Sequence, residues 1–413
     1  MQVPFSPPDI SQAEIDEVCD ALRSGWITTG PKTKELEKEI AAFCNTQYAC
    51  CLNSATAAME LCLHALAVGP GDEVITLAYT YTASASVVCH VGAELKLVDS
   101  QEDSYEMDYD KLADLISEKT KVIIPVDLAG RMVDYPKLFE VLESVKHRFK
   151  PTKGTLQECF DRPIVLADAA HSFGAEQAGD KSGSVADFTS FSFHAVKNFT
   201  TAEGGALVWK ERAGLDSKSF YQTIMNLSLH GQTKDALSKT KLGSWEYDIV
   251  APYYKCNMTD INAALGLAQM KSYNKKLKRR RELIEGYNQA FSDMQRFSYL
   301  DHYSDLKSQT GLLIPQSSSG HLYLLSLKRC SLEQRNELIV RMAQEGIACN
   351  VHYKPLPLLS AYKNLGFKIE DFPHAYQHYS HEISLPLHTC LSDEQHAYVC
   401  ENLLNCEAEI KLV

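Results

Sequence analysis

The stretch Ser190-Phe-Ser-Phe-His-Ala-Val-Lys197-Asn-Phe-Thr-Thr-Ala-Glu-Gly-Gly205 contains one lysine just past an apolar run, followed by a pair of glycines. The apolar run, from Phe188 to Phe193, is rich in aromatic residues and is typical of a strand. A lysine is nearly always a surface charge. One that follows a buried strand is partly desolvated, which lowers its pKa and makes its amine a competent nucleophile.

A second stretch, Val165-Leu-Ala-Asp168-Ala-Ala-His171-Ser-Phe-Gly174, ends another apolar run with an aspartate. A carboxylate at the end of a buried strand needs a partner, because an unpaired charge is costly there. The plainer alternative is that Asp168 caps a helix. A lysine amine that holds an aldehyde as a Schiff base, and a carboxylate that keeps a pyridine nitrogen protonated, are what a pyridoxal phosphate enzyme needs. His171 is then expected near the ring hydroxyl or simply in the following loop.

Short β-rich runs alternate with helical stretches through the first half of the chain. Strands are expected at 74–79, 95–99, 121–126, 164–167, 188–193 and 206–209, and helices at 83–90, 109–117 and 136–145. This alternation predicts a mostly parallel sheet with helices on both faces. Ligands of such sheets bind at the carboxyl ends of the strands, where Asp168 and Lys197 are both expected. Beyond this region we expect a helix at 260–291, a strand at 321–327, and helices at 332–345 and 393–404.

The totals exclude several classes of protein. The chain has 413 residues and a formal net charge of -12, and an acidic balance disfavours a nucleic-acid partner. Its 13 cysteines include no Cys-x-x-Cys pair, so we expect reduced, mostly buried thiols and no metal site. The start of the chain lacks the pattern of a signal peptide, and no apolar run approaches the ~20 residues of a membrane span. These features predict a cytoplasmic protein that has no membrane partner.

Several further residues have side chains suited to a cofactor or a substrate. Asn53–Met59 places small hydroxyl residues before a helix, whose free N–H groups suit a phosphate, although ordinary capping is the alternative. Ser192 lies near the same strand end as Lys197 and offers a hydroxyl to a phosphate. Tyr81 is placed to stack on a planar ring, with a core position as the alternative. His194 is either a core histidine or a substrate contact.

Two polar segments have plain explanations. The basic run Lys275-Lys-Leu-Lys-Arg-Arg-Arg281 lies inside the long expected helix, and we expect a solvated face rather than a nucleic-acid site. Residues 146–162 interrupt the alternation and are expected to form a polar loop on the surface.

Taken together, in this order and spacing, these stretches resemble the DegT/StrS-type sugar aminotransferases. That family consists of fold-type-I pyridoxal phosphate enzymes acting on nucleotide-linked keto sugars. The resemblance covers nearly the whole chain and is strongest to the UDP-4-amino-4-deoxy-L-arabinose–oxoglutarate aminotransferase subgroup. Further stretches that carry it are Ser24–Lys32, Tyr254–Leu265, Val351–Leu356 and Ile383–Leu387.

The resemblance implies an α/β fold of type I, with a mostly parallel seven-stranded sheet between helices and a smaller C-terminal α+β domain. We expect the large cofactor-binding domain at 1–255 and the small domain at 256–413. Two segments depart from the family. Residues 146–162 are longer than in most relatives, and residues 234–248 match no relative clearly and are expected to shape the substrate pocket.

The resemblance also implies a role for each candidate residue. Lys197 would be the catalytic Schiff-base lysine and proton shuttle, and Asp168 would pair with the pyridine nitrogen. His171 would lie at the ring oxygen and Tyr81 on the ring face. The phosphate would be held by Ala55, Thr56, Ser192 and, from the neighbouring subunit of a homodimer, Lys255, where many relatives carry asparagine. The substrate would meet Trp26, Thr28, Thr29, Gly30, His194, His321 and Tyr323.

The function implied is transfer of an amino group from L-glutamate, which leaves as 2-oxoglutarate, to a nucleotide-linked keto sugar. C4 of a UDP- or dTDP-sugar in surface polysaccharide or lipopolysaccharide biosynthesis is the expected acceptor. The alternatives are a pyridoxal-dependent sugar dehydratase, an aminotransferase working at C3, and a non-catalytic scaffold that keeps the fold. Relatives that act as dehydratases replace the lysine with histidine, so Lys197 favours aminotransfer.

Overall fold

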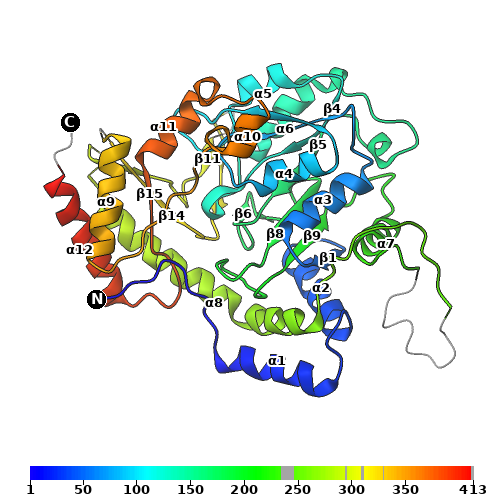
Figure 1. The fold of residues 1–413 in the computed structure, drawn as a ribbon, viewed down its shortest axis with the longest axis horizontal. Helices are drawn as coiled ribbons and strands as arrows, with labels where there is room; N and C mark the ends of the chain where they lie inside the picture. Colours follow the sequence, from blue (N-terminus) through cyan, green and yellow to red (C-terminus); the bar gives the residue numbers. More distant parts are fainter. Residues whose placement is uncertain (234–245, 294, 308–310, 329, 411–413) are drawn as a thin grey trace.

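A computed structural model describes residues 1–233, 246–293, 295–307, 311–328 and 330–410. A seven-stranded sheet forms its centre (Figure 1). Only β9 runs against the other six strands, so the predicted mostly parallel α/β sheet is confirmed. In spatial order the strands are β1 (Ala49–Leu52), β9 (Gly205–Trp209), β8 (Phe188–Ser192), β5 (Ile164–Asp168), β4 (Thr120–Ile124), β2 (Glu73–Leu77) and β3 (Glu94–Val98).

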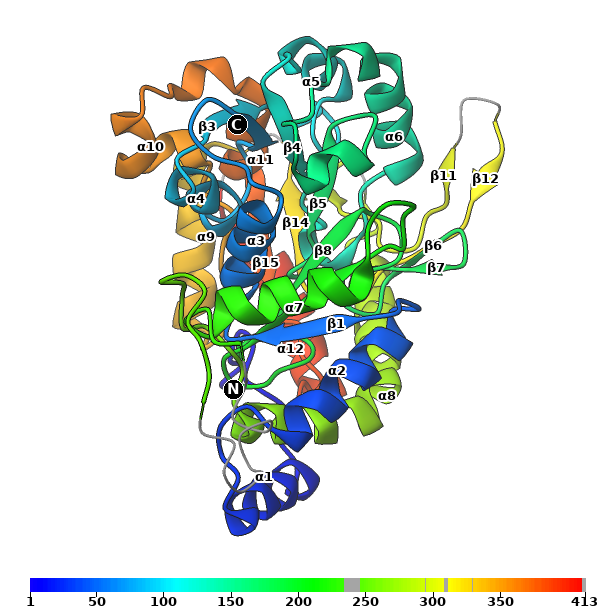
Figure 2. The same cartoon turned by 90° about the vertical axis from the view of Figure 1, so that its right-hand side faces the viewer.

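Both faces of this sheet are covered, because successive side chains of each strand enter different cores. On β4, Val122 and Ile124 pack on one side and Ile123 on the other. Such doubly buried strands read as continuous apolar runs, and six of the seven were predicted from the sequence, while the four-residue β1 was not. One face is covered by α3 (Ala55–Ala65), α4 (Ala83–His90) and α7 (Ser217–Ser228), and Figure 2 shows α7 running alongside β1. The other face is covered by α2 (Pro31–Phe43), α5 (Tyr109–Leu115), α6 (Tyr135–Ser144) and the first turns of α8 (Asp260–Ala290).

The C-terminal part has its own sheet and core. Its antiparallel sheet consists of β10 (Phe297–Tyr299), β14 (Tyr323–Leu327) and β15 (Glu382–Leu385). The helices of this part are α9 (Leu332–Gln344), α10 (Ser360–Asn364), α11 (Pro373–His381) and α12 (Asp393–Glu409). Two small sheets complete the fold of the described residues. One joins β13 (Gln316–Ser317), β6 (Glu176–Gln177) and β7 (Asp180–Lys181), and the other pairs β11 (Leu306–Lys307) with β12 (Leu313–Ile314).

The long helix α8 joins the two parts. Its first half packs on α2 and on α1 (Gln12–Ser24), and its second half enters the C-terminal core through Leu283 and Tyr287 (Figure 1). The N-terminal segment also reaches that core, since Val3 pairs with Ile347 and packs within it. The division at residues 255 and 256 remains a prediction.

Two expectations about polar segments need correction. The basic run at 275–281 is not simply a solvated face, because Lys276 and Arg280 are only 9% and 4% exposed. The Arg280 guanidinium instead donates to the carbonyl oxygens of Gly320, His321 and Leu387.

The segment 146–162 is not only a surface loop. It forms two short 3-10 turns, Lys146–Arg148 and Leu156–Cys159, and buries Phe149 and Phe160. Gln157, also buried, donates to the carbonyl of Leu66, so the segment is anchored to the large core.

The thiols and the helix lengths bear on two more expectations. All 13 cysteines are free, but the expectation that most are buried is wrong. Six are buried, namely Cys44, Cys50, Cys51, Cys62, Cys330 and Cys406, while Cys89 and Cys390 are exposed and the others are half-buried. Within the described ranges, no helix is long and apolar enough to cross a membrane.

Candidate active site

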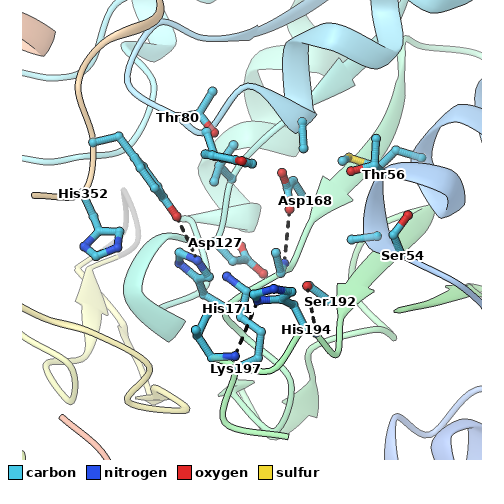
Figure 3. Close-up of a pocket in the computed structure, with 18 of the residues that line it drawn as sticks. Ser54, Thr56, Thr80, Asp127, Asp168, His171, Ser192, His194, Lys197 and His352 are labelled. Atoms are coloured by element: carbon cyan, nitrogen blue, oxygen red, sulfur yellow. Dashed lines mark hydrogen bonds between the residues drawn. The ribbon is translucent and has the colours of Figure 1, made fainter. Parts of the chain in front are cut away.

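A cavity of about 370 Å³ opens at the carboxyl ends of the central strands (Figure 3). Loops after β2, β4, β5 and β8 line most of it, and the C-terminal part contributes the loop with His352 and Tyr353. Of the residues expected at the site, it brings together Ala55, Thr56, Tyr81, Asp168, His171, Ser192, His194 and Lys197. Residues from four neighbouring parallel strands meet here because those strands end at one edge of the sheet.

Lys197 lies in a tight turn after β8, where its N–H donates to the carbonyl of His194 at 2.9 Å. Its side chain enters the cavity, and among the described residues its Nζ has no hydrogen-bond or ion-pair partner. Burial lowers the Lys197 pKa to about 8, and the carboxyl group of Asp168 opposes that shift. A lysine amine that loses its proton near neutral pH is a usable nucleophile and base.

Asp168 is the last residue of β5 and is only 5% exposed. Ser84 donates its hydroxyl to Oδ2 at 2.6 Å, and the N–H of Ala170 donates to Oδ1 at 3.2 Å. Burial raises the Asp168 pKa, while these two donors and Lys197 lower it. No α-helix follows Asp168, so the structure excludes the N-cap alternative and leaves a buried carboxyl facing the cavity.

His171 is held in one tautomer by its neighbours. Its Nδ1 accepts the N–H of Ala129 at 3.1 Å, and its Nε2 lies 3.1 Å from the hydroxyl of Tyr353. Burial and the charge of Lys197 lower the His171 pKa well below its ordinary value, so the ring is neutral. A neutral ring that accepts at Nδ1 carries its proton on Nε2. His171 therefore donates to Tyr353, whose own O–H is free to point into the cavity.

The N-terminus of α3 forms the far wall. Ala55 and Thr56 are its first two residues, and Ser54 caps it by accepting the N–H of Ala57 at 3.0 Å. The first N–H groups of a helix have no partner within it, which makes this end suited to an anion. Gly205 permits the close approach of α3 to β9, because a Cβ there would lie 2.4 Å from the nitrogen of Ala55.

Two residues lie at the mouth of the cavity. Tyr81 is 59% exposed, so the alternative of a core aromatic is wrong, and its ring lies 5.9 Å from that of Tyr353. His194 is also exposed and lies 3.6 Å from the carboxylate of Glu203, so it is not a core histidine.

Ser54, from the hydroxyl-bearing stretch Asn53–Met59, also lines the cavity. Other lining residues were given no role from the sequence, among them Thr80, Asp127, Glu203, His352 and Tyr353. Asp127 lies three residues beyond the end of β4, and Asp168 is the last residue of β5. That position at a strand end is the signal that would have found Asp127. His352 and Tyr353 follow no strand of the large sheet, so periodicity gives no signal for them.

The stretch Trp26–Gly30 does not line this cavity and packs instead on the start of α8. Thr29 donates to the carbonyl of Met258 at 2.6 Å, and Gly30 donates to Asp260 at 2.8 Å. Thr28 is exposed, and the indole of Trp26 covers Gly30 so closely that a Cβ there would overlap it.

Three more expected residues lie outside the cavity. His321 sits behind His171, with ring centroids 4.4 Å apart, and its Nδ1 lies 2.8 Å from Oδ1 of Asn198. Tyr323 is fully buried in the C-terminal core and donates to Asn288. Lys255 is exposed beside Asn257. Residues 234–245, most of the stretch expected to shape the substrate pocket, lie outside the described residues.

The residues of the cavity fit pyridoxal phosphate. An amine without a partner suits its aldehyde, a buried carboxyl suits its pyridinium nitrogen, and a helix N-terminus suits its phosphate. Lys197, Asp168 and the start of α3 supply these groups from three elements around one cavity.

The sequence matches the DegT/DnrJ/EryC1/StrS aminotransferase family over residues 8–149 and 158–404. The unmatched residues between these ranges fall within the segment 146–162, which was expected to be longer than in relatives. The chain is 35% identical over 402 residues to the spore coat polysaccharide biosynthesis protein SpsC of Bacillus subtilis, covering 95% of this chain and 94% of SpsC. It is also 35% identical to the UDP-4-amino-4-deoxy-L-arabinose–oxoglutarate aminotransferase of Shewanella sediminis, covering 85% of this chain and 83% of that enzyme.

Solved structures agree with these relatives. Spr1654 from Streptococcus pneumoniae, a protein named as a sugar aminotransferase, has a PMP form that matches with a TM-score of 0.93 and 54% identity, covering 99% of this chain and 100% of that one. Its PLP form matches with the same TM-score and 52% identity, covering 99% of this chain and 100% of that one. Helicobacter pylori PseC, an aminotransferase involved in the biosynthesis of pseudoaminic acid, matches with a TM-score of 0.83 and 25% identity, covering 99% of this chain and 100% of PseC.

Proposed function

This chain belongs to the DegT/DnrJ/EryC1/StrS aminotransferase family and is a pyridoxal phosphate-dependent sugar aminotransferase, and from that premise we propose its substrates. Glutamate gives the amino group, and the acceptor is a nucleotide-linked keto sugar, most simply at C4 of a UDP- or dTDP-sugar. The reaction takes place in the cytoplasm and feeds a surface polysaccharide or lipopolysaccharide.

The observation that carries the proposal is that the amine of Lys197 and the buried carboxyl group of Asp168 line the same cavity. When bound, pyridoxal phosphate supplies an electron-withdrawing ring that stabilises negative charge on the carbon that loses its proton. Lys197 holds and returns that proton at Nζ, since a pKa of about 8 suits both steps near neutral pH. Asp168 holds the pyridinium, and Ser84 and Ala170 fix the direction of its carboxylate.

The other residues of the cavity bind and orient. Ala55, Thr56 and Ser192 receive the phosphate at the start of α3 and the end of β8. Tyr353 directs an O–H into the cavity because His171 donates to its oxygen. Tyr81 covers the entrance and is available to stack on a planar ring.

We further propose that two copies of this chain share their active sites, with Lys255 reaching the phosphate of the partner's site. Lys255 does not line the cavity of its own chain. Apolar and aromatic side chains near it are exposed in the single chain, which is typical of a protein interface: Tyr247, Ile249, Val250, Tyr253 and Tyr254.

A coupled assay with glutamate and a panel of UDP-, dTDP- and GDP-linked 4-keto sugars, with 3-keto sugars beside them, tests the substrates. We expect 2-oxoglutarate and a 4-amino sugar from a UDP- or dTDP-sugar. Amination only of a 3-keto sugar would move the reaction to C3, and loss of a hydroxyl without amination would favour the dehydratase. A protein that takes up no cofactor would favour the scaffold.

A further inference from the structure

His352 is fixed in the cavity wall from several sides. Its N–H donates to Oε2 of Glu382 at 2.9 Å, and its carbonyl accepts the hydroxyl of Tyr79 at 2.8 Å. The ring of Phe5 stacks on its imidazole with centroids 5.6 Å apart and planes 18° apart. Main chain and ring are therefore both held, and only the position of the ring proton stays open.

A chain of hydrogen bonds leads from this imidazole into the protein. Nδ1 of His352 lies 2.8 Å from Oγ of Ser384, and Ser384 is hydrogen-bonded to Oε1 of Glu382. Glu382 and Ser384 lie on β15 and are both fully buried. Among the described residues, Nε2 of His352 has no hydrogen-bond partner, and His352 lines the cavity.

The hydrogen bonds between His352, Ser384 and Glu382 can be oriented in two ways. With Glu382 ionised, Ser384 donates to the carboxylate and accepts the proton of Nδ1, so Nε2 of a neutral His352 is an acceptor. With Glu382 protonated, the carboxyl donates to Ser384, Ser384 donates to Nδ1, and Nε2 carries the proton and is a donor. Burial and the charge of Lys197 lower the His352 pKa to about 3, so the ring stays neutral in both directions.

The two substrates of the proposed reaction differ in how they can hydrogen-bond to Nε2 of His352. A sugar hydroxyl both donates and accepts, so it can bind either form of His352. A carboxylate of glutamate only accepts, so it binds the donor form and is repelled by the lone pair of the acceptor form. Resting on the proposed function, we propose that Glu382, acting through Ser384, sets the tautomer of His352 and thereby decides whether the cavity admits the carboxylate of the amino donor.

Glu382 is placed to titrate in the working range. Burial raises its pKa to about 8, whereas the Ser384 hydroxyl, the N–H of His352 and the charge of Arg335 lower it. The titratable groups that face Glu382 from the packed elements are Arg335, Tyr79, Tyr105, Cys349 and Tyr353. Those that face His352 are Lys197, His171 and His321.

Glu382→Gln imitates the protonated carboxyl. The amide oxygen accepts the N–H of His352, and the amide NH₂ donates to Ser384, which fixes His352 as a donor at every pH. Glu106→Gln is the matched control, because Glu106 also has a pKa raised by burial, and its two hydrogen bonds both fall on one oxygen.

The test measures kcat/KM for glutamate in the first half-reaction and kcat/KM for the keto sugar in the second, from pH 6 to pH 10. Dividing each wild-type value by the Glu382→Gln value at the same pH cancels the titrations of Lys197 and of the glutamate amine. We expect the glutamate quotient to fall about tenfold per pH unit above pH 8, the slope of one proton, and the sugar quotient to stay level. The quotients for Glu106→Gln are expected to stay level for both substrates.

Ser384→Ala removes the hydroxyl that links Glu382 to His352. This second variant keeps the test decisive if Glu382→Gln folds poorly. Its glutamate quotient is expected to fall in the same way, and the double variant is expected to behave as Ser384→Ala alone. A level glutamate quotient in both variants would overturn the inference and leave the proposed function standing. A wild-type enzyme that does not react with glutamate would overturn both.

Discussion

Asp127 is a second carboxyl group in the cavity wall, next to Asp168. Its N–H donates to the carbonyl of Asp168 at 3.0 Å. Its carboxyl accepts hydrogen bonds from the hydroxyls of Ser172 and Tyr135 and from the N–H of Val133. Burial outweighs these donors and raises the Asp127 pKa to about 7. A site that needs one ionised carboxylate thus keeps its neighbour protonated over much of the acidic range.

This raised pKa predicts a pH dependence of stability for the cofactor-free protein. Below about pH 4 both the folded and the unfolded chain hold the proton, so its contribution is fully present. This contribution of Asp127 to the free energy of unfolding is lost as the pH rises toward 7. The loss is at most about 4 kcal/mol, because each unit of pKa difference between the folded and unfolded chain corresponds to about 1.4 kcal/mol. Denaturant unfolding from pH 4 to pH 8 measures it.

Asp127→Asn is expected to flatten that dependence, because the amide cannot ionise. Its oxygen can accept from Val133 and Tyr135, and its NH₂ can donate to the hydroxyl oxygen of Ser172 in place of a protonated carboxyl. Asp114→Asn, at an exposed position of α5, is the matched control. An Asp127→Asn protein whose stability falls with pH as steeply as the wild type would contradict the assignment.

Single site residues were predictable where they lie at or just beyond the end of an apolar strand. Asp168 and Lys197 each follow an apolar run, and the apolar run marks both the strand and its end. Asp127 has the same signal but lacks a motif of its own. The sequence left open whether His171 lies near the cofactor ring or simply in the following loop. Its ring is held by Ala129 and Tyr353, which lie far from it in sequence, so no local pattern could decide.

Among the elements, six of the seven strands of the large sheet were predicted to within about two residues, because both of their faces are apolar, whereas β1 was missed. The amphipathic α8 was predicted over nearly its full length, yet its basic run was misread. Net charge in sequence does not reveal that Arg280 turns inward toward three carbonyl groups. The hydrogen-bond acceptors of this guanidinium come from segments that are distant in sequence, so no local sequence pattern predicts them.

Arg280→Ala is therefore expected to destabilise the protein by about 2–5 kcal/mol, since it removes a buried donor and leaves three carbonyls without it. Lys278→Ala, two residues away on the exposed face, is expected to stay within about 0.5 kcal/mol of wild type. Thermal and urea unfolding measure both. Equal stabilities for the two variants would show that Arg280 has no such role.

For the molecule as a whole, the cavity is assembled from both parts of the chain. The large sheet supplies Lys197 and Asp168, while the C-terminal part supplies His352 and Tyr353. The N-terminal segment contacts both sides, since Phe5 stacks on His352 and Ser6 donates to the carbonyl of Val196 in the loop after β8. These contacts join segments that are hundreds of residues apart, so a reading along the sequence finds only one side of the site.

Shared active sites predict complementation between two damaged chains. Lys197→Ala and Lys255→Ala are each expected to lower activity at least about tenfold as separate homodimers. After mixing and exchange of subunits, each mixed dimer contains one intact site, so activity is expected to recover to about a quarter of wild type. Activity of the mixture that equals the mean of the two variants would contradict a shared site.

The central claim is that Lys197 in this cavity carries the amino transfer from glutamate. The measurement is the visible spectrum of the protein reconstituted with pyridoxal phosphate, followed during addition of glutamate without any sugar. We predict a yellow protein that bleaches with formation of 2-oxoglutarate. Lys197→Ala is predicted to lose this reaction by at least about a thousandfold, while Lys119→Ala, exposed near the opposite end of β4, keeps it. A Lys197→Ala protein that bleaches as fast as wild type, or a yellow wild type that ignores glutamate, would contradict the claim.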